Sequence, residues 1–473
     1  MPLILPGNVG SATAAGFNVA NSLRFNSGSS DYLNRTPDNA SNRKTFTIST
    51  WIKRSILGTS QFVYNVRPDS NGATGIFFTT GDVLFLTIEP LSKTLVTNRV
   101  FRDPSSWYHI VYAFDTTQGT AANRIKLYVN GVQETSFATA SYPSQNDDLK
   151  ILTGGQTNKQ HISKVHGGAG YFGGYLSEFV FIDGLALTPT DFGEFDEDSG
   201  IWKPIDVSGL TFGTNGFYLD FENSGALGAD VSGNTNNFTV NNLTAIDQST
   251  DTCTTNFATM NPLAPANISS ASEGNLKILQ SSSGGSVIST FGFSSGKWYW
   301  EVELDSQVNY TQLAGVIKES KMESALLTSF NVGANDGGWG YFLQGNSDNG
   351  KAFHNNTASS AYTTMSAGNI LSIAVDSDNG KIFFAVNGTY VNSGNPANGT
   401  GAVYTNLPTG ENLFPAITNY VGDGSTATLL MNFGSPPYSE SGGETDGNGY
   451  GNFAHAVPSG YYALNTKNLA EYG

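Results

Sequence analysis

The sequence predicts an all-β protein made of two tandem antiparallel β-sandwiches of the jelly-roll type, with a small bridging segment between them. Three observations predict this fold: many aromatic-rich runs of strand length, turn residues between these runs, and almost no helical periodicity. The chain contains 30 Phe, 21 Tyr and 6 Trp for a core, and 55 Gly for turns. The best helical segment is a single turn, Thr-Pro-Thr-Asp at 188–191, with Thr as N-cap and Pro at the first helical position.

The same hairpin occurs in both halves of the chain. Residues 107–115 and 124–129 read as two strands, and so do residues 370–376 and 381–386. Each pair is followed directly by Asn-Gly, the strongest local hairpin signal, because both residues accept the positive φ of a type I′ turn. The repetition predicts two modules of one architecture.

We place the first module at 1–195, the bridging segment at 196–265 and the second module, with a C-terminal tail, at 266–473. The middle segment carries strand-like pieces such as 216–221 between Asn/Gly/Asp loops. Its aromatic residues are of the kind that proteins bury, so a flexible linker is not expected there.

Charge and cysteine content exclude several classes of protein. The formal net charge is −16, whereas a nucleic-acid footprint needs clustered Lys and Arg, so we expect no nucleic-acid partner. Cys253 is the only cysteine, which excludes an intrachain disulfide and suits assembly in a reducing cytoplasm. Residues 1–10 lack the features of a secretory leader, and no run approaches 18 apolar residues, so no membrane association is expected.

The span from residue 21 to residue 194 resembles the laminin-G-like, concanavalin-A-like jelly rolls. The segments that carry this resemblance are FTISTWIK (46–53), WYHIV (107–111), LYVNG (127–131) and LSEFVF (176–181). The resemblance implies a lectin-like sandwich, and relatives of this kind often bind Ca²⁺ at a loop rim.

The span from residue 285 to residue 464 resembles a SPRY domain. Its motifs occur in order and at plausible spacing: GKWYWEV (296–302), AGV (314–316), GY (340–341), the hairpin at 370–388, LFPA (413–416) and MNFG (431–434).

The combined arrangement is similar to structural proteins of tailed bacteriophages. The segments SLRFN (22–26), LNRTP (33–37) and TNFATMNPL (255–263) carry that likeness. It implies a non-enzymatic virion structural protein, assembled in the host cytoplasm and displayed on the virion surface as a tail fibre or adhesin. Other virion proteins, a homo-oligomer and host-surface glycan are the partners that it implies. A capsid-decorating protein that clamps neighbouring subunits is the main alternative.

The strongest enzyme-like signal is the row Glu301, Glu303 and Asp305. Residues i, i+2 and i+4 of a strand share one face, so three carboxylates would line up as in concanavalin-like glycosidases. Their order departs from the Glu-x-Asp-x-(x)-Glu pattern, and the same strand matches SPRY. We therefore expect a solvated face without catalysis, and a glycosidase stays the less favoured alternative.

Two other constellations have plain interpretations beside functional ones. His161 and His166 are five residues apart in a polar stretch, a spacing that suits no standard zinc motif, and we expect loop histidines. Asp230, Ser232 and Asn234 present alternating oxygen ligands that hard cations prefer, so this loop is the candidate Ca²⁺ site, with an ordinary loop as the alternative. No other cofactor is expected.

Binding is the function that the fold favours. Sandwich modules place recognition in loops at one rim, where a sugar ring stacks on an exposed aromatic side chain. The best candidates in the second module are Trp339, Tyr341, His354 and Asn355.

Overall fold

The computed structural model describes residues 16–69, 72–154, 159–263, 269–281, 284–306, 310–322, 332–421, 425–440 and 442–473. Within them it confirms the all-β prediction, with antiparallel sheets and short 3₁₀ turns. One of these turns is Pro189–Asp191, with Thr188 as the predicted N-cap and Asp191 completing a capping box. An α-helix, α2 (Thr466–Tyr472), had no counterpart in the prediction. In the described part of the chain no helix is long and apolar enough to cross a membrane.

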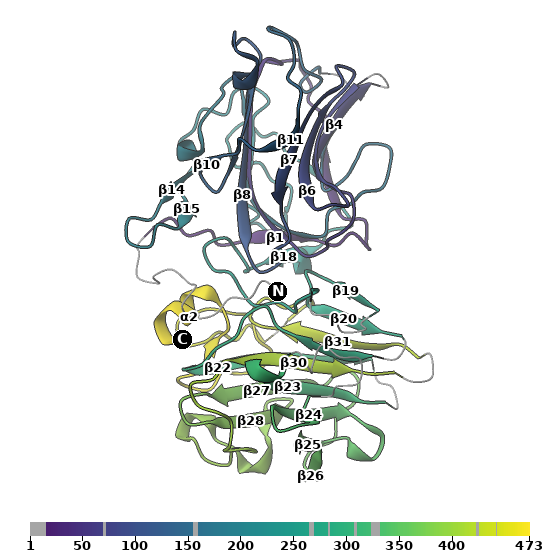
Figure 1. Cartoon of the computed structure of the whole chain (residues 1–473), viewed down its shortest axis with the longest axis vertical. Helices are drawn as coiled ribbons and strands as arrows, with labels where there is room; N and C mark the ends of the chain where they lie inside the picture. Colours follow the sequence, from purple (N-terminus) through teal and green to yellow (C-terminus); the bar gives the residue numbers. More distant parts are fainter. Residues whose placement is uncertain are drawn as a thin grey trace. The chain divides into compact units, whose positions relative to one another are not determined.

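The chain divides into two compact units, which we call the N-terminal unit (14–254) and the C-terminal unit (255–473). In Figure 1 the N-terminal unit runs from purple to teal and the C-terminal unit from green to yellow.

The N-terminal unit is a sandwich of two eight-stranded sheets. The first sheet has the order β10 (Val132–Gln133), β9 (Ile125–Val129), β8 (Trp107–Asp115), β3 (Thr45–Arg54), β13 (Gly174–Asp183), β1 (Ser22–Phe25) and β18 (Gln248–Ser249), with β16 (Phe217–Leu219) also paired to β13. The second sheet has the order β11 (Phe137–Ala140), β7 (Lys93–Val100), β6 (Val83–Ile88), β5 (Gly72–Phe78), β4 (Gln61–Asp69), β12 (Lys159–Ile162), β2 (Tyr32–Arg35) and β17 (Thr239–Asn241). A small hairpin joins β14 (Gly193–Phe195) to β15 (Trp202–Pro204).

The core of this sandwich consists of the alternate side chains that face inward from both sheets. Phe46 of β3 stacks on Phe114 of β8 and on Phe181 of β13, with ring centroids 4.2 and 5.7 Å apart. Residues of the second sheet such as Tyr64 and Phe78 complete the same buried cluster.

Residues 196–254 belong to the N-terminal unit and do not form a separate bridge between modules. Their strands extend its two sheets, because β16 pairs with β13, β17 with β2 and β18 with β1. Phe217 and Phe238 fill the core between the sheets, which explains the buried-type aromatics of the segment. The boundary of the unit therefore follows Thr254, and not residue 195.

The C-terminal unit is a second sandwich. Its third sheet has the order β19 (Ser270–Ser272), β20 (Lys277–Gln280), β31 (Ala427–Asn432), β22 (Lys297–Ser306), β27 (Ile370–Asp376), β28 (Lys381–Val386) and β29 (Thr389–Tyr390), with β32 (Tyr462–Ala463) paired to β22. Its fourth sheet has the order β21 (Gly285–Ile288), β30 (Leu413–Asn419), β23 (Gln312–Lys318), β24 (Gly338–Gln344), β25 (Lys351–His354) and β26 (Thr357–Ala361).

The Asn-Gly turns have the predicted geometry in both units. Asn130 and Gly131 have φ of 49° and 78°, and Asn387 and Gly388 have φ of 47° and 76°. In each turn the asparagine side chain accepts a hydrogen bond from a backbone N–H. The donor is His109 for the first turn, at 2.7 Å, and Ile370 for the second, at 2.9 Å. The two hairpins are thus the same local structure.

Candidate functional site

The two aromatic residues predicted to bind a ligand at a rim, Trp339 and Tyr341, are core residues of the C-terminal unit. Trp339 is 2% exposed and Tyr341 is fully buried, because both point from β24 toward the interior of the sandwich. The indole N–H of Trp339 donates to Asn406 Oδ1 at 3.1 Å, and Tyr341 Oη donates to the Thr363 carbonyl at 2.6 Å. The prediction that they meet a sugar ring is corrected.

The other two predicted residues lie at the end of the same strands. The His354 ring stacks on Trp339, with centroids 4.7 Å apart, and its Nδ1 lies 2.8 Å from the Gly338 carbonyl oxygen. Asn355 is exposed and has φ of 48°, as does its neighbour Asn356 at 55°, so this pair forms the turn between β25 and β26. In the structure His354 therefore covers Trp339, and Asn355 is a turn residue.

The carboxylate row Glu301, Glu303 and Asp305 is not a solvated face. Glu301 is fully buried, Glu303 is partly exposed and Asp305 is exposed. The C-terminal segment covers the outer face of the third sheet, where Phe453 and Tyr461 join its buried residues in one cluster. The solvated-face prediction is therefore wrong for Glu301.

Glu301 connects the sheet to this covering segment. Its carboxylate accepts hydrogen bonds from the backbone N–H groups of Ala454 (2.9 Å) and His455 (3.0 Å), from Tyr299 Oη (2.8 Å) and from Asn432 Nδ2 (3.2 Å). Burial raises the pKa of Glu301 to about 7, because these donors only partly offset the loss of water. A carboxyl enclosed by its own chain in this way is a structural group.

The raised pKa of Glu301 predicts how stability depends on pH. The folded protein keeps this proton between the ordinary pKa of 4.5 and about pH 7, whereas the unfolded chain loses it. The contribution of Glu301 to the free energy of unfolding is therefore fully present below pH 4.5 and is lost as the pH rises through 7. The loss is on the order of 3 kcal/mol.

Denaturant melts of the wild type and Glu301→Gln across pH 4 to 8 measure this contribution as the difference between the two curves. Asp305→Asn is the control on the same strand, because the Asp305 side chain is exposed. Parallel curves for the wild type and Glu301→Gln would contradict the assignment.

A Ser-His pair in the N-terminal unit has the wrong protonation for nucleophilic catalysis. His109 is fully enclosed, and burial lowers its pKa to about 3. Its Nδ1 accepts from the indole N–H of Trp202 at 3.0 Å, so the neutral ring carries its proton on Nε2. That nitrogen lies 2.8 Å from Ser49 Oγ, and as a donor it cannot accept the serine proton.

A small hollow lies beside this pair. Its cavity volume is only about 10 Å³, about the space of one water molecule, and it is lined by Trp51, His109, Glu178 and six other residues. Burial raises the pKa of Glu178 to about 8, and Tyr218 Oη donates to its carboxyl at 2.6 Å. Glu178 has φ of 50° at a bulge in β13.

The candidate Ca²⁺ residues are engaged with their own loop. The Asp230 carboxylate accepts from the backbone N–H groups of Tyr218, Ser232 and Asn236 and from Ser232 Oγ, at 2.7 to 3.0 Å. The Asn234 amide donates to two backbone carbonyls, of residues 213 and 216. In the described residues no group of three or more His, Cys, Asp or Glu side chains is placed to hold a metal. The Ca²⁺ assignment stays a prediction.

The outer face of the second sheet carries an aromatic row that we did not predict. Phe62 of β4, Phe77 of β5 and Phe85 of β6 are all partly exposed, and they stack across three adjacent strands. The ring centroids are 4.5 Å apart for the first pair and 4.8 Å apart for the second. These strands lie side by side in the purple-to-blue part of Figure 1. We call Phe62, Phe77 and Phe85 the phenylalanine row.

The phenylalanine row continues into two tyrosines. The backbone N–H of Phe62 donates to the Gly170 carbonyl at 2.8 Å, which places the next residue, Tyr171, beside the row. The Tyr171 ring lies 6.2 Å from the ring of Tyr32 on β2. Both tyrosines are partly exposed.

One sequence signal could have found the row. Phe77 and Phe78 are adjacent on a strand, so their side chains must point to opposite faces of the sheet. Phe78 is fully buried in the core, which leaves Phe77 on the outer face.

The two histidines predicted as loop residues adjoin Tyr32. His161 lies on strand β12 and is only 4% exposed, so that part of the prediction is corrected. His166 lies in the following loop, and its ring is 5.3 Å from the ring of His161.

Comparison with known families supports the two resemblances. Residues 27–191 match the laminin G model of the concanavalin A-like lectin/glucanases superfamily, and residues 297–435 match the SPRY domain model. No curated protein matches the sequence of this chain.

Three solved structures illustrate the likeness. The SPRY domain of human HERC1 is 16% identical, with 33% of this chain and 87% of that chain covered and a TM-score of 0.26. The TRIM65 PSpry domain is 17% identical, with 37% and 91% covered and a TM-score of 0.28. A putative carbohydrate binding protein from Bacteroides ovatus ATCC 8483 is 14% identical, with 48% and 59% covered and a TM-score of 0.30.

Proposed function

We propose that this chain, which contains a concanavalin A-like domain and a SPRY domain, is a non-enzymatic binding protein that holds glycans on the outer face of its second sheet. The observation that carries the proposal is the phenylalanine row. Three aromatic side chains stand outside the core of the N-terminal unit, on a sheet face that contributes nothing to the sandwich interior.

The dimensions of the row suit a short oligosaccharide. Two steps of 4.5 and 4.8 Å give an apolar strip about 9 Å long, close to twice the spacing of neighbouring strands. The apolar C–H face of a sugar ring can pack on such a strip while its hydroxyl groups remain in water. A contiguous aromatic patch on the surface of a protein is a common feature of binding sites.

Phe77→Ala tests this function. The variant removes the central ring, which stacks on both neighbours, so we expect glycan binding to weaken by about 2 kcal/mol or more. The free energy of unfolding should change by only about 1 kcal/mol, because the ring lies outside the core.

A glycan array followed by titration calorimetry measures this binding. Tyr362→Ala is the matched control, because Tyr362 is 36% exposed and belongs to the other unit. Full binding by Phe77→Ala, or binding lost equally in Tyr362→Ala, would contradict the proposal.

We further propose that the protein is displayed on a virion surface and contacts other virion proteins or copies of itself. The similarity of segments 22–26, 33–37 and 255–263 to tailed-phage structural proteins supports this location. An exposed apolar patch supports a protein contact: Val132, Phe195 and Ile201 are 58%, 50% and 46% exposed around Trp202. Imaging of labelled particles tests the location, and sedimentation of Phe195→Ser tests the contact.

A further inference from the structure

We propose that the glycan held by this face is acidic, and that its anionic group binds at a basic corner next to the phenylalanine row. The basic corner consists of Arg67, Lys159, Lys164, His161 and His166. This inference rests on the proposed glycan-binding function and names the class of sugar.

Positive charge is concentrated here against the balance of the whole chain. The chain has 23 Lys and Arg against 39 Asp and Glu. The charges that act on His166 are nevertheless all positive, from Arg67, Lys159 and Lys164. A local positive potential on an acidic protein favours an anionic ligand and repels a cation.

The ammonium group of Lys164 has an aromatic environment. It lies 4.2 Å from the ring centroid of Tyr32 and 5.6 Å from that of Tyr171. Among the side chains that the structure describes, neither Lys164 nor Lys159 has a carboxylate within 4.0 Å. A cation–π contact at a partly exposed site is weaker than a charge-assisted hydrogen bond to an anion, so the ammonium can gain a partner.

The two histidines add a second, independent observation. The Nδ1 atoms of His161 and His166 are both buried and have no hydrogen-bond partner among the residues that the structure describes, and the whole His161 side chain is only 4% exposed. Burial, reinforced by the neighbouring cations, lowers the pKa of His161 to about 4 and also lowers that of His166. Buried polar atoms are normally paired, so this corner is not satisfied by the chain alone.

The corner and the row form one continuous face. Tyr32 links them, since its ring lies 6.1 Å from the ring of His161 and 6.2 Å from the ring of Tyr171. Tyr171 in turn follows Gly170, whose carbonyl accepts a hydrogen bond from the backbone N–H of Phe62. A sugar chain along the row would therefore bring a carboxylate, phosphate or sulfate substituent to Lys164.

Titration of matched acidic and neutral sugars tests the inference. The probes are trigalacturonic acid, its fully methyl-esterified form and inorganic phosphate, preceded by an array that carries acidic glycans with neutral counterparts. The proteins are the wild type, Lys164→Met, which keeps the aliphatic stem over the tyrosines, and Lys126→Met on β9 of the other sheet as the control.

We expect the acidic form to bind about tenfold more tightly than the ester at low salt, as one charge-assisted bond would provide. Lys164→Met should remove this preference, and Lys126→Met should keep it. Raised salt should weaken binding of the acid only.

Three other outcomes would each overturn a particular part of the inference. Equal binding of acid and ester that is lost in Phe77→Ala overturns the acidic preference and leaves the proposed function standing. Binding of phosphate as tight as that of the acidic sugar overturns the sugar part of the inference. Absence of binding to every glycan overturns both the inference and the proposed function.

Discussion

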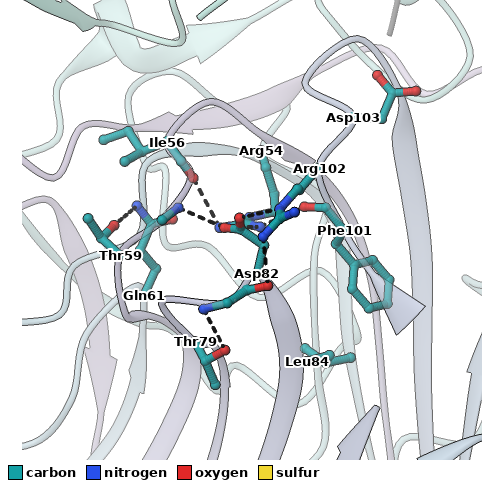
Figure 2. A network of polar contacts seen from close by, with 12 residues as sticks. Arg54, Ile56, Thr59, Gln61, Thr79, Asp82, Leu84, Phe101, Arg102 and Asp103 are labelled. Atoms are coloured by element: carbon teal, nitrogen blue, oxygen red, sulfur yellow. Dashed lines mark hydrogen bonds and ion pairs between the residues drawn. The ribbon is translucent and has the colours of Figure 1, made fainter. Parts of the chain in front are cut away.

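Asp82→Ala should lower the free energy of unfolding by about 3 to 5 kcal/mol, because it leaves the guanidinium of Arg54 buried without its counter-charge. Arg54 is fully buried, and its Nη1 lies 3.1 Å from Asp82 Oδ1. Figure 2 shows Asp82 between the guanidinium groups of Arg54 and Arg102.

The Asp82 carboxylate holds several segments together. Its Oδ1 also accepts from the backbone N–H of Gly58 at 2.7 Å, and its Oδ2 accepts from Arg102 Nε at 2.9 Å. Arg54 in turn donates to the Phe101 carbonyl at 2.6 Å. Since Arg54 ends β3 of the first sheet and Asp82 lies in the turn between β5 and β6 of the second sheet, this pair joins the two sheets.

Chemical denaturation at pH 7 measures the effect. Glu194→Ala is the control in the same unit, because Glu194 lies 3.4 Å from Lys203 but is 57% exposed. An exposed ion pair contributes less than about 1 kcal/mol, so the control should unfold almost as the wild type does. If Asp82→Ala loses no more stability than Glu194→Ala, the network does not hold the sheets together.

Local patterns predict the fold of this chain well, because strand alternation and turn chemistry are local. The Asn-Gly turns at Asn130 and Asn387 and the capped turn at Thr188 follow from the conformations that those residues allow. The affiliation of residues 196–254 could not be predicted in this way. Strands β16, β17 and β18 have only two or three residues each, and β17 and β18 pair with strands more than 200 residues earlier in the chain.

The candidate site was predicted less well. The alternation of side chains along a strand predicts which residues share a face, but it does not predict which of the two faces is buried. Trp339 and Tyr341 share one face of β24, as their spacing requires, and that face is the interior. Glu301 likewise lies on the face of β22 opposite to Trp300, as strand alternation requires. A distant segment covers that face, and nothing near Glu301 in the sequence indicates that cover.

Trp339→Ala should lower the free energy of unfolding by about 3 to 5 kcal/mol, the usual result of truncating a buried Trp. The indole lies in the core of the C-terminal unit at 2% exposure, between the sheets. Its removal leaves a cavity that the surrounding β-sandwich can fill only in part. It also deprives the His354 ring of its stacking partner at 4.7 Å and Asn406 of its indole donor.

Two further variants separate these contributions. Trp339→Phe keeps most of the apolar volume and loses the N–H, so its cost should be smaller, about 1 to 2 kcal/mol. Tyr362→Ala truncates a side chain that is 36% exposed in the same unit and should change stability by less than about 1 kcal/mol. Calorimetry of the full chain compares the three variants.

Glycan binding gives the sharper test of where the site lies. No residue of the phenylalanine row or of the basic corner comes from the C-terminal unit. Below its melting temperature, Trp339→Ala should therefore bind glycan as the wild type does, while Phe77→Ala does not. A Trp339→Ala protein that keeps wild-type stability and loses glycan binding would reverse the assignment and return the site to β24, because only a ligand-contacting Trp339 gives that combination.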